Sequence, residues 1–154
     1  NGSFNEQTTE VLESCGINYA RTVLSTGKFD LPNDWLRLNP TCHHKDPKLI
    51  DYVKEFLNLN SGRKPLLFYL WGHSYEFNDN NNWYIIENFG KEIGNRDDIW
   101  YATNGEIYDY VMAYNNLIFS ADGQLIKNSE NIDIYLHCHS KNVKISAGSM
   151  IRIS

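Results

Sequence analysis

Positive charge is scarce in this chain, and lysine and arginine form no cluster. The sequence holds 14 basic and 19 acidic residues, so its formal net charge is -5 at neutral pH. Proteins bind nucleic acids largely by neutralising backbone phosphates with basic side chains. The composition therefore argues against a nucleic-acid partner.

Long apolar runs are missing as well. No segment approaches the roughly 20 apolar residues of a membrane-spanning helix, so no membrane span is predicted. The chain opens on residues 1–4 (Asn-Gly-Ser-Phe), without an initiating methionine and without the basic and then apolar run of a signal peptide. We expect a piece of a longer protein, for which a cytoplasmic and a secreted location are both compatible with the sequence.

Cysteines are few, and several catalytic motifs do not occur. Cys15, Cys42 and Cys138 are an odd number with no CxxC spacing, which indicates neither a disulfide framework nor a zinc knuckle. A glycine-rich phosphate loop and a GxSxG elbow are both missing, so nucleotide chemistry and a serine nucleophile have no support.

The 154 residues are enough for a hydrophobic core, and aromatic side chains are abundant. Hydrophobic residues make up 42% and charged residues 21%, as in ordinary globular proteins. Aromatic residues reach 14%, with four Trp and ten Tyr. They indicate either an aromatic-rich core or a sugar-binding surface, because flat rings pack on the apolar faces of sugars. Composition alone favours the core.

Helices and strands are predicted to alternate up to about residue 114. Helix signals occur at 5–15, from Asp46 to about residue 60, at about 83–94 and at 103–114. Strands are predicted at 17–23, 66–71 and 99–102. Such alternation is typical of parallel strands joined by crossover helices. The irregular connection 24–45 is long enough to suggest a functional loop.

From residue 117 the pattern changes to short runs of alternating polarity separated by turn residues. This pattern predicts an antiparallel β appendage. We therefore expect two parts, residues 1–116 and residues 117–154.

The segment 66–77 ends an apolar run abruptly on Gly72 and His73. A buried strand that carries a histidine at its C-terminal end is how α/β barrels present catalytic groups. His73 is therefore the first candidate for a catalytic residue.

Five blocks, taken in order, resemble the C-terminal half of a polysaccharide deacetylase domain of the NodB type (carbohydrate esterase family 4). The blocks are 2–5 (Gly-Ser-Phe-Asn), 16–23 (Gly-Ile-Asn-Tyr-Ala-Arg-Thr-Val), 40–46 (Pro-Thr-Cys-His-His-Lys-Asp), 70–77 (Leu-Trp-Gly-His-Ser-Tyr-Glu-Phe) and 99–107 (Ile-Trp-Tyr-Ala-Thr-Asn-Gly-Glu-Ile). The resemblance covers roughly residues 1–116.

The resemblance implies an α/β fold, a partial (β/α) barrel carrying the C-terminal antiparallel appendage. It implies metal-dependent removal of acetyl groups from an acetylated oligo- or polysaccharide. The family's divalent metal, usually zinc, activates water and polarises the carbonyl. Its ligands and the catalytic base belong to a Thr-Phe-Asp-Asp block and a His-x-x-x-His block, and neither occurs in this chain. We therefore expect no metal ligands here, and no activity from this chain alone.

By its position in the family pattern, His73 corresponds to the general acid, which protonates the leaving group. His43 and His44 are predicted to line the substrate groove, with metal ligation and a structural role as alternatives. Ligation of one metal by both is disfavoured, because adjacent side chains in an extended chain point to opposite faces. Glu76 could orient His73 or be a solvated loop carboxylate.

The remaining candidates for substrate binding come from the aromatic residues and the first block. Trp35 and Trp71 could stack on sugars or simply pack. Gly2 and Ser3 would lie at the groove rim, although Ser3 could equally belong to the turn that enters a helix.

A second hypothesis is a non-catalytic carbohydrate-binding or dimerising module derived from the same fold. Half a barrel leaves strand edges open, so two copies could pair, or the chain could pair with the missing half.

Overall fold

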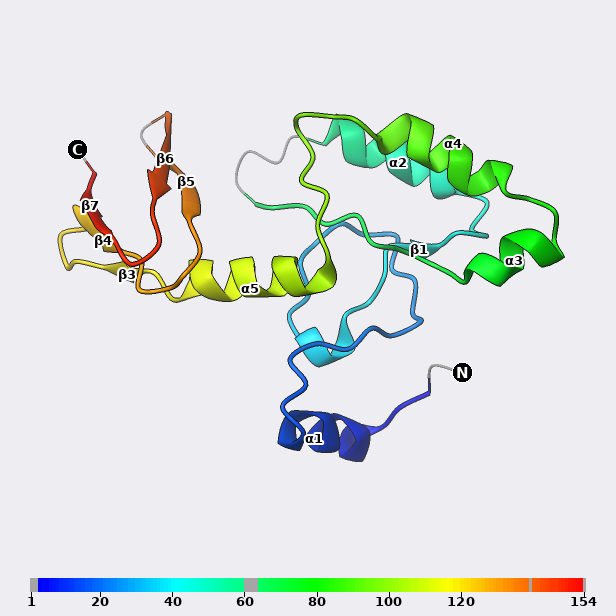
Figure 1. Ribbon diagram of the computed structural model, residues 1–154, viewed down its shortest axis with the longest axis horizontal. Helices are drawn as coiled ribbons and strands as arrows, with labels where there is room; N and C mark the ends of the chain where they lie inside the picture. Colours follow the sequence, from blue (N-terminus) through cyan, green and yellow to red (C-terminus); the bar gives the residue numbers. More distant parts are fainter. Residues whose placement is uncertain (1–2, 60–63, 139, 154) are drawn as a thin grey trace. The chain divides into compact units, whose positions relative to one another are not determined.

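The computed structural model describes residues 3–59, 64–138 and 140–153. The chain divides into two compact units, Asn1–Trp100 and Tyr101–Ser154, called here the N-terminal and C-terminal units (Figure 1). Among the helices in these residues, none is long and apolar enough to cross a membrane.

Helices dominate the regular structure of the N-terminal unit. Its elements are α1 (Glu6–Ser14), the 3-10 helix η1 (Trp35–Arg37), β1 (Cys42–His43), α2 (Leu49–Asn58), β2 (Leu70–Trp71), α3 (Ser74–Asp79) and α4 (Tyr84–Ile93). Helix α1 begins as predicted, because the Asn5 side chain accepts a hydrogen bond from the Thr8 backbone N–H at 2.9 Å. It ends before Gly16, whose φ of 72° suits a residue without a side chain.

The parallel pair β1–β2 brings two distant segments side by side. Cys42 pairs with Leu70 and His43 with Trp71, so the predicted groove histidines and the segment that leads into His73 meet at one end of the pair. The predicted strand 66–71 is regular only over Leu70–Trp71. Immediately before β2, the Tyr69 backbone N–H donates to the side-chain hydroxyl of Thr41. The segment next to β2 thus offers side-chain as well as backbone acceptors.

Phenylalanines hold this unit together. Phe29, Phe56, Phe68 and Phe89 form a chain of ring contacts with centroid separations of 5.3–5.6 Å. They join the long connection, α2, the approach to β2 and α4, which lies beside α2 (Figure 1). Some of the aromatic side chains therefore belong to the hydrophobic core, which is the interpretation that composition favoured.

The C-terminal unit consists of one helix and five short strands. The elements are α5 (Asn104–Asn115), β3 (Ile118–Phe119), β4 (Leu125–Lys127), β5 (Ile134–Cys138), β6 (Lys141–Ile145) and β7 (Met150–Arg152). All strand pairs are antiparallel, in a β3-β4-β7 sheet and a β5-β6 hairpin. The predicted antiparallel character of this segment is confirmed. Helix α5 packs into the core of the C-terminal unit through Ala113. The sequence pattern had instead assigned this helix to the first part, residues 1–116.

Two predicted strands do not form. In 17–23 only Arg21 makes an isolated bridge, to Leu38, and 99–102 has no strand. Apolar residues in 17–23 remain exposed, Val23 by 39%, so burial does not favour a regular strand there. Conversely, α3 was not predicted, because six residues are too few for a periodic signal.

Candidate functional site

Glu76 lies at the centre of a cluster of three histidines and a lysine. It occupies the first turn of α3 and reaches back to the His73 backbone N–H, which donates to Oε2 at 3.2 Å. This reciprocal arrangement at a helix start orients the Glu76 side chain toward the end of the β1–β2 pair. Only 16% of the side chain is exposed, so Glu76 is not a solvated loop carboxylate.

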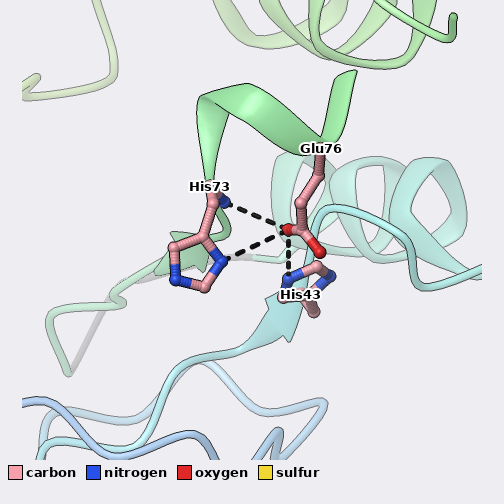
Figure 2. Close-up of side chains that lie close together, drawn as sticks. All are labelled: His43, His73 and Glu76. Carbon is pink, nitrogen blue, oxygen red and sulfur yellow. Dashed lines mark hydrogen bonds and ion pairs between the residues drawn. The ribbon is translucent and has the colours of Figure 1, made fainter. Parts of the chain in front are cut away.

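The two carboxylate oxygens of Glu76 have different partners. Oε2 lies 3.2 Å from His43 Nε2 and 3.4 Å from His73 Nδ1, as Figure 2 shows. Oε1 accepts a hydrogen bond from the Lys45 ammonium at 2.8 Å. This hydrogen bond is the main reason that the pKa of Glu76 falls to about 2, so the carboxylate is ionised at neutral pH.

His43 is held in one orientation by contacts on both ring nitrogens. The Lys45 backbone N–H donates to Nδ1 at 3.1 Å, so Nδ1 of the neutral ring is an acceptor and the proton is on Nε2. Nε2 faces Glu76 Oε2. The Trp71 ring meets the imidazole edge to face at 4.4 Å between centroids. Burial lowers the pKa of His43 below its ordinary value, which favours the neutral ring.

His44 is the buried member of the cluster. Only 2% of its side chain is exposed, and neither ring nitrogen has a hydrogen-bond partner in the described residues. Its Nε2 lies 3.7 Å from Glu76 Oε2, and its ring packs on Phe77 at 4.2 Å. Burial, followed by the neighbouring His43, lowers the pKa of His44. The other side of the ring lies directly against the backbone of Gly72, where a Cβ would overlap Nδ1.

His73 is the exposed member. Its side chain is 48% exposed, and Nδ1 turns toward Glu76 while the other ring nitrogen points away (Figure 2). In the part of the chain that the structure describes, no hydrogen-bond partner is found for Nε2. Tyr75 flanks the ring at 5.2 Å and is itself 59% exposed. The geometry is that of an imidazole oriented on one side and free to exchange a proton on the other.

The structure gathers four of the predicted site residues and leaves the others apart. His43, His44, Trp71 and His73 lie together around Glu76. Among the described contacts of this cluster, none involves Ser3, which is exposed before α1, or Trp35, which is half-buried in η1. Gly2 lies outside the described residues. Asp46 accepts from the Lys48 backbone N–H in a turn, but it is not the predicted helix cap, because α2 begins at Leu49 with Lys48 as its N-cap.

Prediction from the sequence missed or undervalued three candidate functional residues. Glu76 is the hub, and its spacing of three from His73 was the available signal. Nothing in the sequence indicated a role for Lys45, because only the fold brings its ammonium group to the carboxylate of Glu76, 31 residues away. Arg21 stacks over the Trp71 ring at 4.3 Å, which covers one face of that ring.

The buried histidines predict a pH-dependent stability of the N-terminal unit. The unfolded chain takes up protons at the ordinary pKa of 6.5, whereas folded His43 and His44 do so only at lower pH. The free energy of unfolding is therefore expected to fall as the pH drops from about 7.5 to about 5.5. Glu76 stays ionised in both states over this range and contributes little.

Urea unfolding followed by tryptophan fluorescence measures this, because all four tryptophans lie within the first 100 residues. The variant His44→Phe keeps an aromatic ring at the buried position but cannot titrate, so its stability should fall less. A fall of the same size in this variant would contradict the assignment.

The metal that the family resemblance implies is bound, in that family, by residues that have no counterpart in this sequence. Its ligands belong to the two blocks that this sequence lacks. Comparison with known proteins adds no relative: no family model, curated protein or solved structure matches the chain.

Proposed function

We propose that this chain is part of a metal-dependent carbohydrate deacetylase of the NodB type, in which it forms part of a (β/α) barrel and His73 is the proton donor. One observation carries the proposal: the imidazole of His73 is half-exposed, and its Nδ1 faces the ionised Glu76. A carboxylate beside one ring nitrogen orients the imidazole, so that the other ring nitrogen can face the leaving group, as a general acid requires.

In this reaction, water adds to the acetyl carbonyl and the tetrahedral intermediate then collapses. The bond between the carbonyl carbon and the sugar nitrogen or oxygen breaks, and the leaving atom takes a proton. His73 Nε2, on the side of the ring away from Glu76, supplies that proton (Figure 2). Activation of the water belongs to the family's metal and base, for which this chain has no residues.

The substrate class is an acetylated oligo- or polysaccharide. Tyr75 is the nearest exposed ring to His73 and offers a flat apolar surface for a sugar unit. Trp71 serves instead as packing, since Arg21 covers one face and the His43 ring makes a T-shaped contact with it. Within the proposal, His43 supports Glu76 rather than touching substrate.

Acetate release tests the proposal. The 154-residue chain and the longer protein that the proposal requires are each incubated with acetylated chitin or xylan oligomers and zinc or cobalt. Only the longer protein is expected to release acetate. Acetate from the chain alone would contradict the missing metal and base. Lack of release by the longer protein across all substrates would contradict the deacetylase assignment.

A non-catalytic carbohydrate-binding module is the second candidate, and exposed aromatic side chains favour it. Besides Tyr75, Trp83 is 48% and Tyr84 60% exposed around the start of α4. Binding of the same oligomers by the chain, measured by calorimetry without metal, together with an inactive longer protein, would select this candidate over the first.

A further inference from the structure

The strongest feature beyond proton donation is the convergence of nitrogen and oxygen atoms on one point. His43 Nε2, His73 Nδ1 and one oxygen of Glu76 lie within 4.8 Å of one another, and in the described ranges this is the one such group of histidine, cysteine and acidic side chains. Lys45 donates to Oε1 of Glu76. Oε2 faces both histidine rings and also accepts the His73 backbone N–H (Figure 2).

We infer that His43, His73 and Glu76 form a binding site for a divalent transition metal of the zinc class. Imidazole nitrogen and carboxylate oxygen are the donors that zinc takes, in a tetrahedral arrangement. Bonds of about 2.1 Å place tetrahedral ligand atoms about 3.4 Å apart. The separations from Glu76 Oε2 are 3.2 Å to His43 and 3.4 Å to His73. Both separations from the carboxylate oxygen are therefore close to tetrahedral spacing, and the two histidine nitrogens lie within 4.8 Å of each other.

His44 supplies an independent observation. Its imidazole is almost completely buried, its Nε2 has no hydrogen-bond partner, and this atom lies 3.7 Å from Glu76 Oε2. A buried nitrogen without a partner is costly, and a cation beside the shared oxygen would relieve that cost when Nε2 carries the lone pair. Three ligands leave a fourth position, which His44 or a water molecule fills.

Metal binding changes the protonation of His43 in a way that can be observed. A neutral imidazole bound through Nε2 carries its proton on Nδ1, where the Lys45 backbone N–H now donates. The proton of Nε2 is thus displaced, and the hydrogen bond from Lys45 to Nδ1 breaks. This cost weakens the site relative to a structural zinc site, and it gives binding a local signature at the Lys45 amide.

The experiment titrates zinc chloride into the metal-free 154-residue chain. Calorimetry should show one zinc per chain, and the Lys45 amide proton should move upfield in NMR spectra as its hydrogen bond is lost. Cobalt at the same site should give the intense visible absorption of a four-coordinate ion. His43→Ala and His73→Ala should each weaken zinc binding at least about tenfold, by loss of a ligand.

His137→Ala is the matched control, since it removes an exposed histidine of the C-terminal unit that pairs with Asn142. It should bind zinc like the unchanged chain. Equal affinity in the His43 and His73 variants, or a Lys45 amide that does not respond to zinc, would overturn the site. His73 is half-exposed, so its variant is expected to fold, and circular dichroism checks this.

One consequence rests on the proposed function. A metal on Nδ1 prevents His73 from becoming an imidazolium, so excess zinc should inhibit acetate release. Because the titration measures binding to the chain alone, its failure would leave the proton-donor role of His73 standing. Zinc binding to a protein without deacetylase activity would leave the metal site standing.

Discussion

Under the proposed function, replacing His73 with glutamine is expected to lower kcat for acetate release by about 10²–10⁴-fold in the longer protein that this function requires. The leaving group would then depart without a proton donor, whereas the binding surfaces around Tyr75 remain. The loss should therefore appear in kcat more than in KM. Initial rates of acetate release at saturating acetylated oligosaccharide measure it.

The control for this variant is His137→Gln, which makes the same chemical change at an exposed histidine of β5. It should retain the kcat of the unchanged protein. A second readout comes from leaving groups of different acidity. Substrates whose leaving atom needs no proton should lose much less rate in the His73 variant. An equal loss with every leaving group would point to a structural role for His73.

Gly72→Ala is expected to destabilise the N-terminal unit by about 1–3 kcal/mol, because it adds a methyl group where there is no space. The new Cβ would overlap Nδ1 of His44. That ring cannot swing away easily, since it packs between Phe77 and His43 at centroid separations of 4.2 and 4.3 Å. The close approach of backbone to ring, rather than an unusual φ, is what requires glycine here.

Urea unfolding followed by tryptophan fluorescence measures this loss. Gly90→Ala is the matched control: a Cβ at Gly90 meets no atom within 4 Å, and the residue lies inside α4, so alanine should be neutral or stabilising there. In a His44→Ala background, Gly72→Ala should cost much less, because the overlapping ring is gone. An undiminished cost in the double variant would show that the ring is not the obstacle.

Local signals in the sequence predicted the starts of α1 and α5, although α3 was missed and α2 begins at Leu49 rather than just after Asp46. The caps at Asn5 and Thr103 start α1 and α5, because each satisfies backbone donors within its own first turn. The predictions of strands at 17–23 and 99–102 were wrong. Strand formation depends on a pairing partner and on burial, and the local sequence pattern reports neither. The C-terminal strands were predicted more accurately, because close turns join β3 to β4 and β5 to β6.

The residues of the candidate site likewise fall into those that local sequence indicates and those that only the fold brings together. His73 could be singled out from residues 66–77 alone, because an apolar run that stops at Gly-His indicates a strand end. Glu76 could be placed near it by helix spacing. The meeting of His43 and His73 at one carboxylate oxygen depends on the parallel pairing of β1 with β2, which joins segments about 28 residues apart.

Short-range information in the chain was thus sufficient for the starts of α1 and α5 and for the antiparallel strands after residue 117, and it singled out His73 as a candidate. Charge pairing of Lys45 with Glu76, burial of His44 against Gly72 and the spacing of the three donor atoms emerge only on folding. The physical reason is that pKa values, ligand geometry and steric fit depend on distances through space, and those distances are set by packing rather than by separation along the sequence.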